Sequence, residues 1–390
     1  MKTSNNDFLG LVELVEKAMS VKDRSHMRPV IEKELLHYDI LFALNEANLL
    51  EKLTFQGGTS LRLCYGAPRF SEDLDFTGGY DFKTQDLMSI KSCLEDYLGK
   101  RYGLEVTVKE PKDFLEEPEN RDIKVSKWQL GLITHPERKD LPKQKIKIEV
   151  ANIPSYSREP RQLLHNYDFL PDGYSDTFVM VQTLEEIFAD KLIAFVNCQS
   201  YIRHRDIWDL HWLRQQGITA NIEFIKKKIK DYKIDNYAQK IDAMLSRLKE
   251  IIYGKEFKDQ MSRFLPMDLQ KNTLLDEKYL FLLLQETYFT LDTLGFEWKE
   301  KESGEIYCTN SLRELTQSAF ENTVIMMQTT KDKYQLLVTY GKQSQELVVS
   351  PSVEKIAKKL YSNPTNKSFL PAGYKLDLSL QPGEWFVKFS

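Results

Sequence analysis

The sequence predicts an α+β fold in which helices flank a sheet, followed by a helical region and a small α+β C-terminal module. Three observations support this prediction. In the first half of the chain, stretches with apolar residues at helical spacing alternate with short apolar segments typical of strands. Residues 218–300 carry mainly helical patterns. The remaining residues, 301–390, return to alternating strand-like segments around one helical stretch.

The first elements surround a pair of glycines. A broad apolar stripe predicts a helix from Pro29 to about Lys52, and Leu53–Phe55 predicts a strand that enters a turn at Gly57-Gly58. The same patterns predict, in chain order, a helix at Thr59–Cys64, a strand at Leu74–Phe76, a helix at Gln85–Gly99, and strands at Leu104–Val108, Ile123–Thr134 and Ile146–Val150.

A proline-rich, polar segment at Pro154–Asp176 predicts a loop. Thr183 and Glu186 form a capping-box pattern at the start of a helix. Further segments predict this helix to about Cys198, helices at Asp206–Arg214 and Glu277–Gly295, a hairpin of Tyr334–Thr339 with Glu346–Val349, and a helix at Val353–Tyr361. We therefore expect domains at residues 1–217, 218–300 and 301–390.

The composition is that of a globular protein and excludes several classes. Hydrophobic residues make up 42% and charged residues 29% of the chain, so disorder is not expected. The net charge of −4 argues against a broadly basic coat for nucleic acid. Four widely spaced cysteines indicate reduced thiols, and the sequence shows neither a signal peptide nor an apolar run long enough for a membrane span. We expect a cytoplasmic protein.

The segment Phe55–Phe76 reads FQGGTSLRLCYGAPRFSEDLDF and carries the strongest functional signal. A glycine pair opens a strand-to-helix turn whose backbone N–H groups suit a phosphate chain. Asp73 and Asp75 follow in an apolar strand and can converge on one metal ion if they lie at its end. The alternatives are glycines that only permit a tight turn, and acids that cap a turn or form salt bridges.

The strings GGTSLR and PRFSEDLDF resemble the AbiEii-type nucleotidyltransferase toxins of bacterial toxin–antitoxin systems, over roughly residues 53–213. The resemblance implies a nucleotidyltransferase-like mixed sheet and two Mg²⁺ ions during catalysis, held by Asp73, Asp75 and a third acid. It implies Glu149 of the segment KIKIEV as that third ligand. Because Lys145, Lys147 and Glu149 share one strand face, the alternative is that Glu149 pairs with a neighbouring lysine.

Several residues near the glycine pair are candidates for binding the nucleotide. Gly57 and Gly58 offer backbone N–H groups, and the hydroxyls of Thr59 and Ser60 either contact the nucleotide or cap the helix. Arg62 is a further candidate. Like Arg69, it either binds phosphate or pairs with Glu72. Ser71 is the last candidate, because it lies at a position where the toxin family carries a serine.

A second cluster follows at residues 183–213. Lys191 shares a helix face with apolar residues, so it either extends along the edge of the core or reaches the triphosphate. The toxin-like families carry a matching lysine followed by an Arg-Asp-x-x-Asp-Leu segment, here Arg205–Leu210, so the resemblance implies function for Lys191 and for Asp206 or Asp209. The alternative for the two aspartates is a helix N-cap and a first-turn acid. His204 and His211 lack a metal-ligand spacing and are expected to pack or lie at the surface.

The resemblance implies an NTP substrate and suggests RNA, notably the tRNA 3′ end, as acceptor. Two basic runs, Arg138–Lys147 and Lys226–Lys230, support RNA binding, although the second also fits the outer face of an amphipathic helix. Alternative functions are transfer to a protein or a small molecule, and a catalytically silent nucleotide- or protein-binding module. A cognate antitoxin is expected without the need for stable contact.

Overall fold

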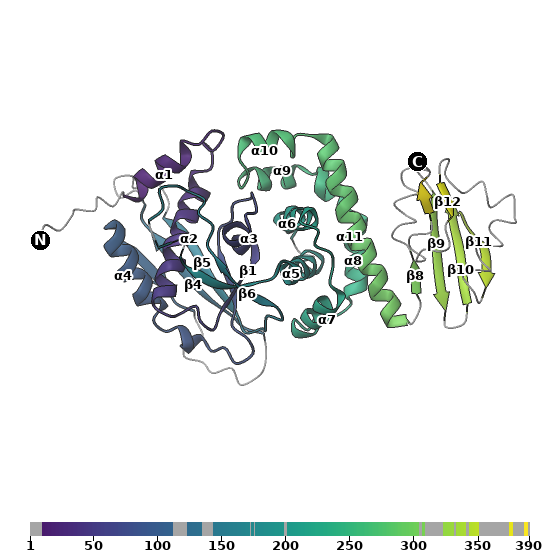
Figure 1. The fold of residues 1–390 in the computed structure, drawn as a ribbon, viewed down its shortest axis with the longest axis horizontal. Coiled ribbons are helices and arrows are strands. Elements are labelled where there is room, and N and C mark those ends of the chain that lie inside the picture. Colours follow the sequence, from purple (N-terminus) through teal and green to yellow (C-terminus); the bar gives the residue numbers. More distant parts are fainter. Residues whose placement is uncertain are drawn as a thin grey trace, which may run out of the picture. The chain divides into compact units, whose positions relative to one another are not determined.

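The computed structural model describes backbone and side chains over residues 10–111, 123–134, 143–171, 173–174, 176–198 and 201–295 (Figure 1). Beyond these it describes backbone elements at residues 296–303, 306–308, 323–330, 333–340, 343–350, 374–376 and 386–388. The chain divides into two compact units. The first unit comprises Met1–Asp235 and Arg247–Leu284, and the second comprises Asn236–Ser246 and Gln285–Ser390. The domain boundaries expected after residues 217 and 300 stay a prediction.

Helices and strands alternate through the first half of the chain. The helices are α1 (Leu11–Met19), α2 (Arg28–Glu46), α3 (Gly57–Tyr65), the 3₁₀ helix η1 (Thr84–Leu87), α4 (Ile90–Tyr102), α5 (Leu184–Asn197), α6 (His204–Gln215), α7 (Ile222–Asp231), α8 (Tyr237–Tyr253), α9 (Lys255–Ser262), α10 (Met267–Asn272) and α11 (Glu277–Ser303). The strands of the first unit are β1 (Thr54–Gln56), β2 (Leu74–Thr77), β3 (Val106–Lys109), β4 (Val125–Leu132), β5 (Gln144–Ala151), β6 (Arg158–Gln162) and β7 (Phe178–Gln182).

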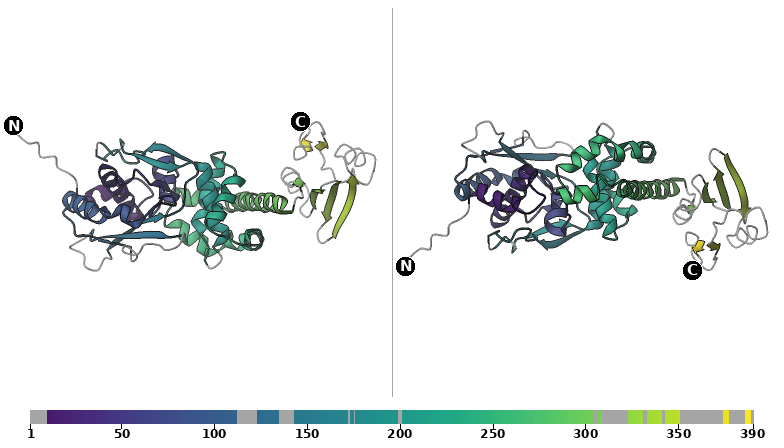
Figure 2. Two further views of the ribbon diagram at one scale, coloured as in Figure 1. Left: turned by 90° about the horizontal axis from the view of Figure 1, so that it is seen from below. Right: turned by 90° about the horizontal axis from the view of Figure 1, so that it is seen from above.

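The sheet of the first unit is mixed. Its seven strands lie in the order β3-β4-β5-β2-β1-β7-β6. β2 pairs in parallel with β5, and β1 with β7, whereas the remaining neighbours pair antiparallel. Helix α2 contacts β5 and the helices α1 and α4, and α5 contacts α6 and α7 (Figures 1 and 2). The sequence prediction of an α+β fold with a mixed sheet and flanking helices is confirmed.

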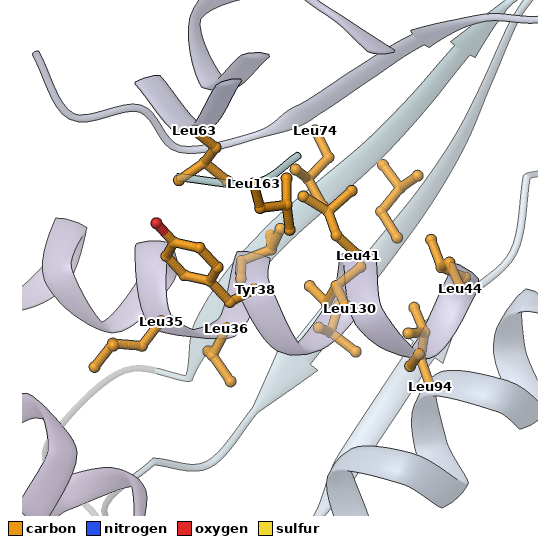
Figure 3. Close-up of a cluster of buried hydrophobic side chains, with 14 of the residues drawn as sticks. Leu35, Leu36, Tyr38, Leu41, Leu44, Leu63, Leu74, Leu94, Leu130 and Leu163 are labelled. Carbon is orange, nitrogen blue, oxygen red and sulfur yellow. The ribbon is translucent and has the colours of Figure 1, made fainter. Parts of the chain in front are cut away.

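Helix α2 forms the centre of the core, and thirteen of its nineteen residues are buried. Its leucines lie in one cluster with leucines of β2, α4 and β4 (Figure 3). Its buried acids have basic partners: Glu34 accepts two hydrogen bonds from Arg62, and Asp39 pairs with Arg101. Burial of apolar side chains, as in this cluster, is the main favourable contribution to the folding of a compact unit.

The structure corrects some predicted elements. Helix α2 ends at Glu46, and the helix predicted at Gln85–Gly99 begins only at Ile90, after the 3₁₀ turn η1. The loop predicted at Pro154–Asp176 contains strand β6, which pairs with β7. Strand β6 was missed because four of its five residues are polar and the fifth is Pro160, a residue that strands accept at a sheet edge.

The capping box predicted at Thr183 is wrong, because Glu186 has other partners. Thr183 does take the N-cap position of α5, but its side chain accepts no capping hydrogen bond. The Glu186 carboxylate instead accepts hydrogen bonds from the backbone N–H groups of Tyr156 and Ser157 and lies 2.6 Å from the ammonium of Lys228 in α7. Both charged side chains are fully buried. This ion pair ties α7 to the start of α5.

Replacing Glu186 with alanine is expected to lower the free energy of unfolding by about 3–5 kcal/mol, because Lys228 then keeps a buried charge with only Asp190 beside it. Urea unfolding followed by circular dichroism measures this loss. The matched control is Glu185→Ala, one residue away and exposed, which should change stability by no more than about 0.5 kcal/mol. Equal losses in the two variants would contradict this account of the pair.

The described strands of the second unit are antiparallel. They are β8 (Ile306–Cys308), β9 (Thr323–Thr330), β10 (Lys333–Tyr340), β11 (Gln343–Ser350), β12 (Tyr374–Leu376) and β13 (Phe386–Lys388). One sheet has the order β11-β10-β9-β8, and β12 pairs with β13. The predicted hairpin is confirmed, because Gln335 pairs with Val349 and Leu337 with Glu346. The helix predicted at Val353–Tyr361 lies outside the described residues.

Candidate active site

A cleft of about 720 Å³ opens in the first unit, where the starts of α3 and β2 meet β4, β5, α5 and α6. Many of the residues that the sequence indicated for a site line this single cleft. They are Gly57, Gly58, Ser71, Asp73, Asp75, Glu149, Lys191 and Asp206. The contiguous motif and the two distant segments thus come together in space.

The carboxylates lie on two neighbouring parallel strands. Asp75 is aligned with Glu149 across β2 and β5, so the two side chains point to the same face of the sheet. Asp73 lies one residue before β2, at the strand end where an Asp-x-Asp pair can converge. Its Oδ1 accepts a hydrogen bond of 3.1 Å from the backbone N–H of Lys147. Three acids therefore face one end of the cleft.

The carboxylate of Asp75 has no direct partner among the described residues. Within the described residues its carboxylate forms no hydrogen bond or ion pair, since the contacts of the cleft's lysines go to other acids. Burial and, second to it, the negative charge of Glu149 raise the pKa of Asp75 to about 6. A bound cation would relieve both effects, because it favours the ionised carboxylate.

The donor set fits a hard divalent cation, which prefers carboxylate oxygens. In the part of the chain that the structure describes, no three His, Cys, Asp or Glu side chains already form a ready metal site. Glu149 instead lies 3.1 Å from the ammonium of Lys127, and Asp73 lies 3.8 Å from that of Lys147. The alternative in which Glu149 pairs with a lysine is thus realised, with Lys127 of the adjacent strand as its partner. The three carboxylates fit a divalent metal ion once the ion pairs of Glu149 with Lys127 and of Asp73 with Lys147 are broken.

The glycine pair begins helix α3 itself and does not form a separate turn before it. Gly57 has φ of +80°, and a Cβ there would lie 2.8 Å from Oδ2 of Asp75. Gly58 has ordinary backbone angles, but a Cβ there would lie 2.5 Å from Nη2 of Arg69. The first N–H groups of a helix have no partner within it, so this helix start can bind an anion beside the acids.

Three residues predicted to bind nucleotide use their polar atoms within the fold. Thr59 donates its hydroxyl hydrogen bond to the carbonyl of Asp73, and Ser60 donates to the carbonyl of Gly57. The guanidinium of Arg62 binds Glu34 of α2. None of the three lines the cleft, so a side-chain role for Thr59, Ser60 and Arg62 at the nucleotide has no geometric support.

On the α5–α6 side of the cleft, Lys191 of α5 contacts two aspartates of α6. Its ammonium lies 2.8 Å from both Asp206 and Asp209. Asp209 also receives two hydrogen bonds, of 2.8 and 2.7 Å, from Arg69, and Asp206 pairs with Arg203. All but Arg203 are almost fully buried. Three cations and two anions leave this network with one net positive charge.

The network keeps its members ionised. Although burial opposes it, the carboxylates of Asp206 and Asp209 raise the pKa of Lys191 above its ordinary value. For Asp209, burial alone would raise the pKa, but the positive charges of Arg69 and Lys191 hold the pKa below its usual range. Asp209 does not line the cleft, so its place in the structure is that of a positioning residue that fixes Arg69 and Lys191.

Replacing Asp209 with asparagine is expected to cost about 3–5 kcal/mol of unfolding free energy, because two buried cations lose a shared partner. The measurement is again urea unfolding, and the Asp259→Asn variant, which alters an exposed acid, is the control. If Asp209→Asn were as stable as this control, the buried cations would not depend on Asp209.

Sequence reasoning missed several basic side chains that line the cleft. They are Lys127, Arg203 and Arg205. Arg62 and Arg69 were expected to meet phosphate or pair with Glu72, whereas Glu72 pairs with Lys33 and Arg205. The segment Arg203-His204-Arg205 directly before Asp206 was a usable signal for two of them. The prediction for the histidines holds: His204 packs edge-on against Phe257 and His211 against Tyr279.

A family model described as "Nucleotidyl transferase AbiEii toxin, Type IV TA system" matches residues 39–280, which is more than half of the chain. The matched range contains every residue of the cleft. No curated protein matches the sequence. Among the described residues, no helix combines the length and apolar character needed to cross a bilayer.

Two solved structures from Helicobacter pylori are similar to the chain. One is JHP933, at 19% sequence identity and a TM-score of 0.33, with 70% of this chain and 95% of that chain covered. The other is described as a candidate nucleotidyltransferase, at 19% identity and a TM-score of 0.29, with 70% and 92% covered.

Proposed function

Since this chain belongs to the AbiEii nucleotidyltransferase toxin family of type IV toxin–antitoxin systems, we propose that it transfers NMP from an NTP to an RNA, at the 3′ end of a tRNA. A toxin of this kind implies a cognate antitoxin, and we propose that neutralisation needs no stable contact between the two proteins. NTP and tRNA occur together in the cytoplasm, which is the location that we propose.

One observation carries the proposal. The acids Asp73, Asp75 and Glu149 and the start of helix α3 share one cleft with the ion network of Lys191. Nucleotidyl transfer requires carboxylates for the metal and positive groups for the triphosphate in adjoining positions. The cleft offers both within one unit of the chain.

The family implies a divalent metal, and we propose Mg²⁺, held by Asp73, Asp75 and Glu149. When bound, two such ions activate the attacking hydroxyl of the acceptor and neutralise charge on the leaving pyrophosphate. The protein's part is to hold Asp75 aimed at the cleft. Gly57 contributes by leaving room for Oδ2 of Asp75.

The remaining groups hold and orient the triphosphate. We assign the backbone N–H groups at Gly57 and Gly58, and the hydroxyl of Ser71, to phosphate oxygens. Lys191 supplies a point charge, and Asp206 and Asp209 keep its ammonium in place. A rigid, preorganised set of this kind lowers the barrier by positioning and by charge stabilisation.

The test is incubation of the purified protein with each labelled NTP in turn and with total RNA or total cell protein. We expect label to appear in RNA of tRNA size, at its 3′ end, and to require a divalent cation. Label in protein or in a small molecule would favour the alternative acceptors. No label in any fraction would leave a silent nucleotide- or protein-binding module.

The two basic runs contribute unequally to the RNA proposal. Half of the run Arg138–Lys147, residues 138–142, lies outside the described residues. In the run Lys226–Lys230, Lys228 is buried against Glu186 and is closed to RNA, whereas Lys227 and Lys230 are exposed on α7. Support for an RNA acceptor therefore comes more from the lysines of the cleft than from α7.

A further inference from the structure

Two lysines of the cleft hold two of the proposed metal ligands. Lys127 of β4 contacts Glu149, and Lys147 of β5 contacts Asp73. Both lysine side chains are more than half exposed, at 59% and 51%, although their ends contact these acids. Ion pairs between such exposed groups are worth about 0–1 kcal/mol, so little free energy holds the lysines where they are.

The order of the strands separates these lysines from Arg69. Going along the sheet, β4 and β5 come first, then β2 with its acids, and then β1, which leads into α3. Arg69 lies against Gly58 at the start of α3, on the far side of the acids from Lys127. Since the triphosphate is assigned to α3, the side at β4 and β5 is left for the acceptor.

We infer that Lys127 and Lys147 bind phosphate groups of a nucleic-acid acceptor, and that they become free to do so when a divalent cation takes Asp73 and Glu149 from them. This inference rests on the proposed function. A divalent cation competes for carboxylates at close range far better than an exposed ammonium does. The two released ammonium groups then face the open cleft beside the site of transfer.

The consequence is that metal binding prepares the protein for its acceptor. Without metal, each lysine is neutralised by an acid, and the β4–β5 side offers an anion little attraction. With metal, the same surface carries two uncompensated positive charges, which bind a phosphate backbone without sequence preference.

The test is the salt dependence of RNA binding, measured by fluorescence anisotropy of a labelled single-stranded RNA of mixed sequence. Ca²⁺ serves as the divalent cation, and EDTA gives the metal-free state. In Ca²⁺, the plot of log association constant against log salt should be shallower by about 1.4 for the Lys127→Gln/Lys147→Gln variant than for the wild type, as expected for two lost phosphate contacts. In EDTA the two proteins should have the same slope.

Lys145→Gln is the matched control, because Lys145 is exposed on the same strand face as Lys147 but does not line the cleft. Its slope in Ca²⁺ should equal that of the wild type. Equal slopes for the wild type and the double variant in Ca²⁺, or an equal loss in Lys145→Gln, would overturn the inference.

A second variant releases the lysines without metal. Asp73→Asn with Glu149→Gln should give, in EDTA, the steeper slope that the wild type shows only in Ca²⁺. Adding Lys127→Gln and Lys147→Gln to it should remove that gain, which shows that the lysines carry the effect. An unchanged slope in EDTA for the neutralised acids would refute the release step.

These binding measurements do not depend on catalysis, so the two proposals fail separately. RNA labelling that persists with no lysine-dependent change in slope leaves the proposed function standing and removes the inference. A lysine-dependent slope without transfer of label to any acceptor contradicts the proposed function. The lysines would then bind nucleic acid, but that nucleic acid would not be an acceptor.

Discussion

Replacing Asp75 with asparagine is expected to reduce nucleotidyl transfer on the order of 10³-fold or more, which corresponds to about 4 kcal/mol of transition-state stabilisation. Asp75 is aligned with Glu149 across two strands, and its carboxylate is the one of the three without a lysine partner among the described residues. An asparagine keeps the shape of the side chain but removes the charge that a metal needs. Transfer of label from NTP at saturating divalent cation measures the loss.

The same variant is expected to be more stable than the wild type when metal is absent. Because burial and neighbouring acids raise the pKa of Asp75 to about 6, ionisation of this group opposes folding above that pH. We expect Asp75→Asn to gain about 1–2 kcal/mol in EDTA at pH 8. Near pH 4 the folded wild type is already protonated at Asp75, so the gain should disappear.

Chemical unfolding at the two pH values checks this pairing of lost activity with gained stability. A salt-bridged acid would behave in the opposite way, because its loss destabilises the protein at neutral pH. Full transfer activity in Asp75→Asn would contradict the proposed function. A loss of stability of this variant at pH 8 would mean that Asp75 has a cationic partner.

Replacing Gly58 with alanine is expected to lower kcat/KM for transfer about 100-fold. The backbone of Gly58 is helical, and alanine is the better helix former, so no loss is expected from conformation alone. The cause would be the new Cβ, which falls 2.5 Å from Nη2 of Arg69 and 3.0 Å from Oγ of Ser71. Arg69 cannot move away cheaply, since it is buried and bound to Asp209 through two nitrogens. A displacement of about 1 Å at such a site costs activity of this order.

Gly99→Ala is the control for Gly58→Ala. It also replaces a helical glycine, in α4, but its Cβ would meet no atom closer than 3.9 Å. This variant should keep full activity and be as stable as the wild type or more stable. If Gly58→Ala were as active as the control, close packing of Arg69 against α3 would be unimportant for transfer.

The sequence predicted correctly those features that depend on residues close together in the chain. The segment Phe55–Phe76 holds the glycine pair and two acids within one strand–helix–strand unit, so its pattern sufficed to bring them to one place. The alternation of KIKIEV placed Glu149 on a strand, and parallel pairing with β2 then aligned it with Asp75. Helices such as α2, α5 and α6 were also predictable, although α1 and ends such as Glu46 were not.

What could not be predicted depends on contacts between distant segments. Nothing in the pattern around Arg69 reveals that its partner is Asp209, 140 residues away. Glu186 has the spacing of a capping residue, yet its carboxylate pairs with Lys228 and accepts hydrogen bonds from the backbone of residues 156–157. Strand β6 contains a proline and few apolar residues, and only its place at the sheet edge allows it to pair.

The bond between Arg69 and Asp209 has a consequence for how the toxin is made. Ribosomes synthesise the acids and glycines of the cleft long before they reach α6, and until then Arg69 lacks the carboxylate that orients it. A nascent chain or a proteolytic fragment that stops short of residue 209 therefore carries the metal-binding motif without a set guanidinium. Because the proposed transfer relies on this guanidinium being held beside Gly58, we expect products truncated before residue 209 to have little transfer activity.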